Sequence, residues 1–248
     1  MSSSFTNPIL LGILWATIIL TFATTLSTAD QSPLESEAKA LLESGWWSGY
    51  HNISRRCKWP GISCNAAGSI TEMTLSGAVY NYSEVQDRFG ELKFSSFPNL
   101  VVLDLSGCQL GGNIPPEIAD LSALKYLGLS SCDLSGELPL SLGNLTNLEF
   151  LDISSNSIHG SIPPQLGKLE KLVSLNLSWT GLTGQIPTSL GTLTNLRHLQ
   201  LSGNQFDEVV LMVCMSKITK TALDKASARN TFLHVDLLLS LTRILACL

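Results

Sequence analysis

Two aspartates at equivalent places in a repeated triplet are the first candidates for chemistry. Asp104 and Asp152 each stand between two apolar residues. If the triplets are strands two places apart in a sheet, about 9.6 Å separates the two aspartate backbones. Inverting glycosidases hold their two carboxylates at a comparable separation. An open sheet with Gly128 between the aspartates builds no pocket, so we do not expect catalysis.

The other residue types that perform catalysis do not fall into active-site patterns. The sequence has no G-x-S-x-G, no phosphate-binding loop, no H-E-x-x-H and no kinase motif. The four histidines are isolated from one another in sequence: His51, His159, His198 and His234. We therefore expect no enzyme activity, no cofactor and no metal.

Aromatic residues point instead to a binding surface. Tyr126 and Phe150 stand just before the triplet in neighbouring copies, His198 takes the same position later, and Trp179 lies nearby. Exposed aromatic clusters supply large contact area and mark binding sites. The alternative is a set of surface aromatics without a role. We predict that a partner contacts Tyr126, Phe150, Asp104, Asp152, Trp179 and His198.

These side chains lie in a leucine-rich pattern of 24 residues that repeats five times between residues 100 and 206. The fold of this repeat must therefore position them. The blocks open at Leu100, Leu124, Leu148, Leu172 and Leu196. Their triplets begin at Leu103, Leu127, Leu151, Leu175 and Leu199, and a small polar residue follows five positions on: Cys108, Cys132, Asn156, Thr180 and Asn204. This sequence pattern resembles the leucine-rich repeat. It implies an α/β solenoid with a short parallel β-sheet on the concave face and turns and short helical or 3₁₀ segments on the convex face.

The second half of each block and the segment before the repeats resemble the plant-specific class of this repeat. Each block carries a Gly-x-Ile-Pro type of turn, as at Gly160–Pro163, and residues 30–69 resemble the plant N-terminal cap. Cys57, Trp59, Gly61 and Cys64 match the C-x-W-x-G-x-x-C box of that cap. The resemblance implies a disulfide between Cys57 and Cys64.

The flanking segments have less regular patterns. Residues 1–29 carry an apolar run that predicts a secretory signal cleaved after Ala29, with an uncleaved anchor as the alternative. Residues 70–99 form an irregular first repeat with six surplus residues in 80–93, either tolerated slack or a contact loop. Residues 207–248 lack an in-phase triplet. They are either foreign to the repeat, in a truncated or alternatively spliced product, or a divergent C-terminal cap.

Charge and sequons describe the exterior. A net charge of −5 without a basic stripe excludes a nucleic-acid partner. Cys108 and Cys132 are expected to be buried free thiols at the ladder position, although a disulfide between neighbouring turns stays open. In a secreted chain four sequons are glycosylation candidates: Asn52, Asn81, Asn144 and Asn176. A glycan on Asn176 would shield part of the predicted binding face.

The resemblance favours an extracellular recognition module similar to the ectodomain of a plant receptor-like kinase. Its partner would be a peptide or protein ligand, another receptor ectodomain, or both. It would lie outside the cell, in the apoplast, with membrane association only through a partner or an uncleaved signal. One alternative is a secreted inhibitor of pathogen cell-wall-degrading enzymes. Another is a truncated product without an independent function.

Overall fold

The computed structural model describes residues 32–47, 49–75, 89–207 and 234–236. The predicted signal peptide, the sequon at Asn81, most of the surplus in the first repeat and most of the C-terminal tail lie outside these residues. Among the described residues, no helix is long and apolar enough to cross a bilayer.

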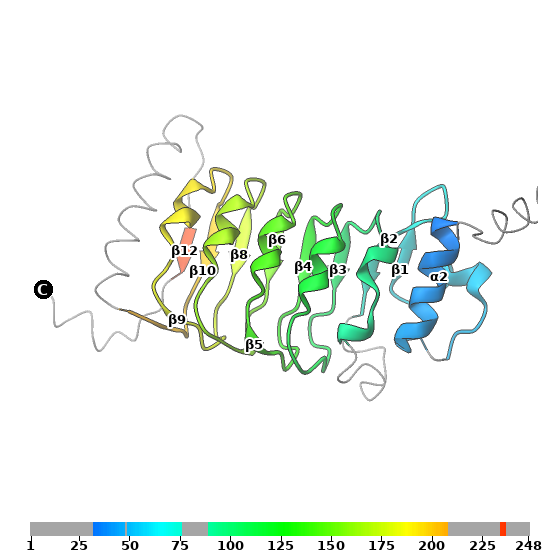
Figure 1. Cartoon of the computed structure of the whole chain (residues 1–248), viewed down its shortest axis with the longest axis horizontal. Coiled ribbons are helices and arrows are strands. Elements are labelled where there is room, and N and C mark those ends of the chain that lie inside the picture. Colours follow the sequence, from blue (N-terminus) through cyan, green and yellow to red (C-terminus); the bar gives the residue numbers. More distant parts are fainter. Residues whose placement is uncertain (1–31, 48, 76–88, 208–233, 237–248) are drawn as a thin grey trace, which may run out of the picture.

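The repeats stack side by side along the long axis of the molecule, each adding one short strand to a single sheet (Figure 1). β1 (Ile62–Cys64) pairs antiparallel with β2 (Ile70–Thr74), and each later pair is parallel. The later strands, in the order in which they pair, are β3 (Val102–Asp104), β4 (Tyr126–Gly128), β6 (Phe150–Asp152), β8 (Ser174–Asn176), β10 (His198–Gln200) and β12 (His234–Asp236).

The triplet leucines form one inner row, as the period predicts. Leu103 pairs with Met73 of β2 and with Leu127 of β4, and the register continues through Leu151 and Leu175 to Leu199. All six side chains are buried. Because successive strand residues point to opposite faces, the residues on either side of this row point away from the core. The solenoid fold is therefore confirmed.

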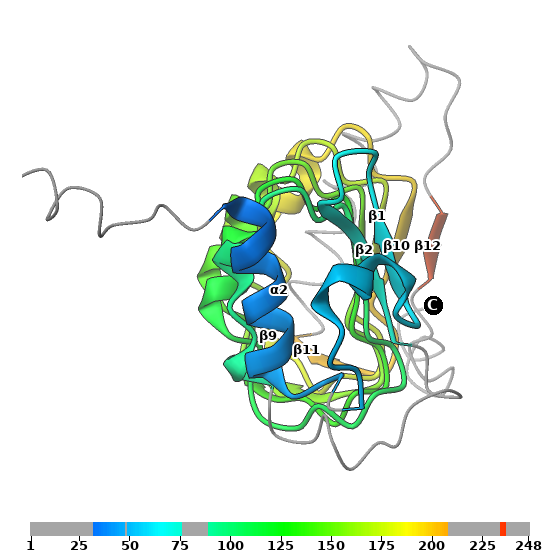
Figure 2. The same cartoon turned by 90° about the vertical axis from the view of Figure 1, so that its right-hand side faces the viewer.

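Short 3₁₀ helices line the side opposite the sheet (Figure 2). Each begins just after a proline whose φ lies between −62° and −70°, which suits the first turn of a helix. They are η5 (Pro116–Asp120), η6 (Leu140–Asn144), η7 (Pro164–Lys168) and η8 (Thr188–Thr192). Two small parallel pairs lie between sheet and helices: β5 (Ser135–Glu137) with β7 (Ser157–His159), and β9 (Thr183–Gly184) with β11 (Gln205–Phe206).

The ladder position joins neighbouring turns through hydrogen bonds. Asn156 Oδ1 accepts from the backbone N–H groups of Cys132 and Leu134, each at 3.0 Å. Its Nδ2 donates to the carbonyl oxygens of Leu129 at 2.8 Å and Ile153 at 2.9 Å. One amide thus satisfies four backbone groups that the turns leave without partners.

A cap covers the first leucine layer. It contains α2 (Pro33–Ser44), η1 (Ile53–Lys58) and β1, and η3 (Phe89–Glu91) and η4 (Phe94–Ser96) follow before the first full repeat. Trp46, Trp47 and Trp59 are buried, and the Trp46 ring stacks 6.4 Å from that of Phe89. The predicted disulfide between Cys57 and Cys64 is present.

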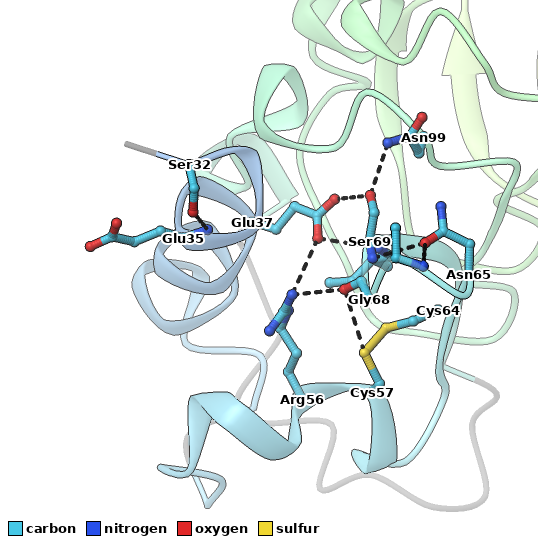
Figure 3. Close-up of polar contacts among 12 residues, drawn as sticks. Ser32, Glu35, Glu37, Arg56, Cys57, Cys64, Asn65, Gly68, Ser69 and Asn99 are labelled. Atoms are coloured by element: carbon cyan, nitrogen blue, oxygen red, sulfur yellow. Dashed lines mark hydrogen bonds and ion pairs between the residues drawn. A yellow bond between two sulfur atoms is a disulfide. The ribbon is translucent and has the colours of Figure 1, made fainter. Parts of the chain in front are cut away.

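A buried carboxylate ties the cap to the repeats (Figure 3). Glu37 of α2 has no exposed surface; one oxygen accepts from the Ser69 hydroxyl and the other from the Ile70 N–H at 3.1 Å. Arg56 lies 4.0 Å from the second oxygen and donates to the Gly68 carbonyl at 2.7 Å.

β12 is a strand that the repeat pattern does not predict. Its three residues pair in parallel with β10, His198 opposite His234 and Leu199 opposite Val235. Val235 follows Leu199 by 36 residues instead of 24, and it replaces the leucine of the triplet. Because both the spacing and the residue type differ from the repeat pattern, no in-phase leucine triplet marks this strand.

Candidate recognition surface on the sheet

The outward residues of β2, β3, β4, β6, β8 and β10 form two columns, which we call the sheet face. The first column, in register from strand to strand, is Glu72, Val102, Tyr126, Phe150, Ser174 and His198. The second is Thr74, Asp104, Gly128, Asp152, Asn176 and Gln200.

Tyr126 and Phe150 form an aromatic pair on adjacent strands. Their ring centroids are 6.1 Å apart and the rings are tilted by 36°. Phe150 is 41% exposed, an unusual exposure for a phenylalanine, and Tyr126 is half-buried. The pair thus offers an aromatic surface of fixed geometry to solvent, as the sequence analysis predicted.

Gly128, which lies between the two aspartates, has no side chain, and the side chains of neighbouring residues occupy the space that one would fill. A Cβ at Gly128 would lie 2.5 Å from Asp104 Oδ1 and 3.0 Å from Tyr126 Cε1. The absence of a side chain therefore lets the Asp104 carboxylate approach the Tyr126 ring. Burial, followed by the charges of Asp104 and Asp152, raises the pKa of the Tyr126 phenol. Both carboxylates thus act on the same side chain.

A short turn holds three polar residues of the second column. Asp104 Oδ1 accepts from the Ser106 N–H at 3.1 Å, and Asp152 Oδ1 accepts from the Ser154 N–H at 2.9 Å. Asn176 Oδ1 forms the same bond with Ser178 at 3.1 Å. A side-chain oxygen in this position stabilises the backbone two residues on, whether it belongs to a carboxylate or an amide.

Asn176 also connects to the neighbouring strand. Its Nδ2 donates to Asp152 Oδ2 at 3.1 Å, and its Oδ1 accepts from the Ser178 hydroxyl at 2.7 Å. Ser154, Ser178 and Ser202, which follow the triplet in three of the repeats, are buried.

Positive charge lies at the edge of the sheet rather than on the sheet face. Lys125, one residue before β4, pairs with Glu149 at 3.0 Å. A shallow cavity of about 390 Å³ lies along this edge, and Glu149, Lys171 and Arg197 contribute to its lining. A second cavity of about 420 Å³ lies between α2 and η1. Neither is lined by Asp104, Asp152 or the aromatic pair.

Trp179 lies after β8 in the left-handed backbone region. Its φ is 55°, its side chain is 64% exposed, and the equivalent residues are Gly107, Ser131, Ser155 and Gly203. The Trp179 N–H donates to the Ser202 carbonyl at 2.8 Å, and its own carbonyl accepts from Asn156 at 3.2 Å. These bonds hold the conformation, which costs about 1–2 kcal/mol for a residue with a side chain.

Residues 82–223, more than half of the chain, match the family model described as a leucine-rich repeat region. The chain belongs to the leucine-rich repeat family.

Plant proteins are among the similar members of the leucine-rich repeat family. A probable leucine-rich repeat receptor-like protein kinase of Arabidopsis thaliana is 37% identical over 100 residues, which cover 34% of this chain and 8% of the kinase. The ectodomain of the Arabidopsis receptor kinase HAESA, solved with an IDA peptide hormone ligand, gives a TM-score of 0.63 at 29% identity, over 83% of this chain and 33% of that one.

A plant ice-binding protein is also similar in structure. Its TM-score is 0.57 at 31% identity, and the match covers 69% of this chain and 56% of that one. This leucine-rich repeat chain thus spans a small part of the kinase and about a third of the HAESA ectodomain.

The structure brings together four of the six predicted contact residues. Tyr126, Phe150, Asp104 and Asp152 lie on three consecutive strands, whereas His198 lies two strands beyond Phe150. Among the described residues, Trp179 makes no ring contact with Tyr126 or Phe150. Glu72, which was not among the predicted contact residues, extends the first column by one strand beyond Val102 and stands directly before the Met73 of its triplet.

The remaining chemically active groups have structural surroundings. Cys108 and Cys132 are buried free thiols, as predicted; they donate to the carbonyl oxygens of Leu75 at 2.8 Å and Leu105 at 3.0 Å. No group of three or more histidine, cysteine or carboxylate side chains that could hold a metal ion occurs in the part of the chain that the structure describes.

Proposed function

We propose that this chain recognises an extended peptide, or an extended segment of another ectodomain, through the sheet face outside the cell. The observation that carries the proposal is the aromatic pair of Tyr126 and Phe150, fixed on adjacent strands and open to solvent. Aromatic side chains supply large contact area at low conformational cost, and they dominate the energetics of many interfaces.

The shape of the sheet favours an elongated partner over a small molecule. Small-molecule sites are concave and enclose most of their ligand, whereas the two cavities described above lie away from the aromatic pair. A solenoid instead offers an extended surface along its axis. The complex of the HAESA ectodomain with a peptide hormone gives a related example.

The first column also varies from strand to strand in size and polarity: Glu72, Val102, Tyr126, Phe150, Ser174 and His198. Such variation suits a partner whose side chains also vary along its length. It does not suit a regular lattice such as ice, which would require the same contact at every repeat. We therefore favour peptide recognition over the role named for the ice-binding relative.

The test is a selection of peptides against the secreted full chain. A library of linear peptides displayed on phage should yield binders to the wild-type protein. The double variant Tyr126→Ala with Phe150→Ala should bind the selected peptides with an affinity at least about tenfold lower. Leu140→Ala is the control, because Leu140 is exposed but belongs to η6 on the opposite side. Failure to select any peptide, or equal loss in the Leu140 variant, would overturn the proposal.

A further inference from the structure

The charge on the sheet face has one sign. Within the two columns defined above, the charged side chains are the carboxylates Glu72, Asp104 and Asp152; no lysine or arginine occurs in either column. Lys125, the nearest lysine in sequence to the aromatic pair, is engaged with Glu149 at the edge of the sheet. A partner that lies along this face therefore meets a negative field, which favours positive charge.

The fold explains an acceptor oxygen at position 104 but not a charge there; at position 152 the second oxygen also accepts from the Asn176 amide. The turn to the residue two positions on needs an acceptor, and Asn176 provides one as an amide with the same bond at 3.1 Å. Asp104 and Asp152 satisfy that requirement and add two charges on either side of Gly128. Unpaired surface charge of one sign costs stability unless something compensates it.

The carboxylates flank an aromatic surface. The Gly128 gap brings Asp104 against the Tyr126 ring, and Asp152 lies on the same strand as Phe150. A cation can be stabilised by a carboxylate and by the face of an aromatic ring at the same time. An arginine guanidinium does this best, because it is planar, stacks on rings and donates hydrogen bonds from its edge; a lysine ammonium is a second fit.

We propose that the pair Tyr126–Phe150, with Asp104 and Asp152, forms a subsite for an arginine or lysine side chain of the extended peptide that binds the sheet face. This inference rests on the proposed function and names the chemistry of its ligand. The cationic head lies between the two carboxylates, its stem rests on the rings, and the peptide continues along the sheet face.

The test uses the same peptide library and the secreted full chain. Peptides selected on the wild-type protein carry arginine or lysine at one fixed position. Replacing that residue by citrulline, a neutral isostere of arginine, weakens binding about tenfold. Asp104→Asn with Asp152→Asn retains the turn acceptors, as Asn176 shows, and gives up the bond that Asp152 Oδ2 accepts from Asn176; thermal unfolding checks that the variant folds. Because both substitutions create an N-x-S sequon, with Ser106 and with Ser154, the wild type and the variant are both secreted into a bacterial periplasm, where the disulfide forms and no sugar is added. In that variant the arginine and citrulline peptides bind equally.

Glu149→Gln with Glu43→Gln is the matched control. This variant also removes two negative charges from the chain, but neither of them lies on the sheet face. It therefore leaves the preference for arginine unchanged. Peptides that bind without a basic residue, or an arginine preference that survives in the Asp104 and Asp152 variant, overturn this inference and leave the proposed function standing. If no peptide is selected, both fall.

Discussion

The indole of Trp179 lies over Gly203 of the following repeat: a Cβ at Gly203 would fall 2.5 Å from Trp179 Cδ2. Both residues occupy the same repeat position and both have a left-handed backbone, with φ of 55° and 71°. A glycine adopts this conformation freely, whereas a bulky residue there is an outlier. A strained, exposed tryptophan resting on a glycine is more readily explained by contact with a partner than by stability.

Trp179→Gly should therefore lose affinity without losing stability. Relief of the left-handed conformation gains about 1–2 kcal/mol, and the extra freedom of glycine in the unfolded chain returns about 0.5–1 kcal/mol. We expect the free energy of unfolding to stay unchanged or rise by up to about 1.5 kcal/mol, measured by chemical denaturation, while binding of the selected peptides weakens. Ser155→Gly at the equivalent position is the control, with similar stability and full affinity. A large loss of stability in the Trp179 variant would mean that the indole is part of the core.

The sequence predicted what the period controls. Regular spacing placed Leu103, Leu127 and Leu151 in one row and put Tyr126 beside Phe150, because register follows directly from a constant repeat length. The conformation of Trp179 was hidden, although the glycines at 107 and 203 mark that position as left-handed. The approach of Asp104 to Gly128 depends on side-chain contacts between strands, which no single triplet reveals.

The buried carboxylate of Glu37 should be essential to the N-terminal cap. Glu37→Ala leaves the Ser69 hydroxyl and the Ile70 N–H without this acceptor, and it removes the carboxylate that faces the half-buried Arg56 guanidinium. Removing one member of a buried charged network costs about 3–5 kcal/mol, measured as the change in free energy of unfolding. Glu43→Ala on the same helix removes an exposed pair with Lys39 at 3.7 Å and should cost less than about 0.5 kcal/mol. Equal effects of the two substitutions would contradict this role.

The ladder asparagine should matter more than a surface asparagine of the same type. Asn156→Ala leaves four backbone groups in two neighbouring turns without the partner that the amide supplies. Each unsatisfied group costs about 1 kcal/mol or more, so we expect the free energy of unfolding, measured with denaturant, to fall by at least about 3 kcal/mol. Asn147→Ala, whose exposed amide bonds Ser122 and Lys171, should cost less than about 1 kcal/mol. A similar loss in both variants would show that burial does not decide the cost.

The two ladder thiols should be unreactive while the protein is folded. Burial raises the pKa of the Cys108 thiol from 9.0 to about 11, and that of Cys132 to about 12. Thiolate is the reactive form, so iodoacetamide at pH 8 should label neither residue until denaturant is added. Because the folded pKa values are raised, their contribution to stability is complete below pH 9 and declines as the pH rises from 9 towards 11 and 12. Rapid labelling of Cys108 or Cys132 in the native protein, read by peptide mass mapping, would contradict the buried geometry.

The sequons at Asn144 and Asn176 should differ in occupancy. Asn144 ends η6 on the helical side and is exposed, so a glycan there meets no obstacle. The Asn176 amide donates to Asp152 and accepts from the buried Ser178, and a glycan on its nitrogen would disturb the first bond and cover the sheet face beside Phe150. Glycopeptide analysis of the folded, secreted chain should find sugar on Asn144 and an unmodified Asn176. Full occupancy at Asn176 would contradict this expectation and would shield the part of the sheet face beside Asp152 and Phe150.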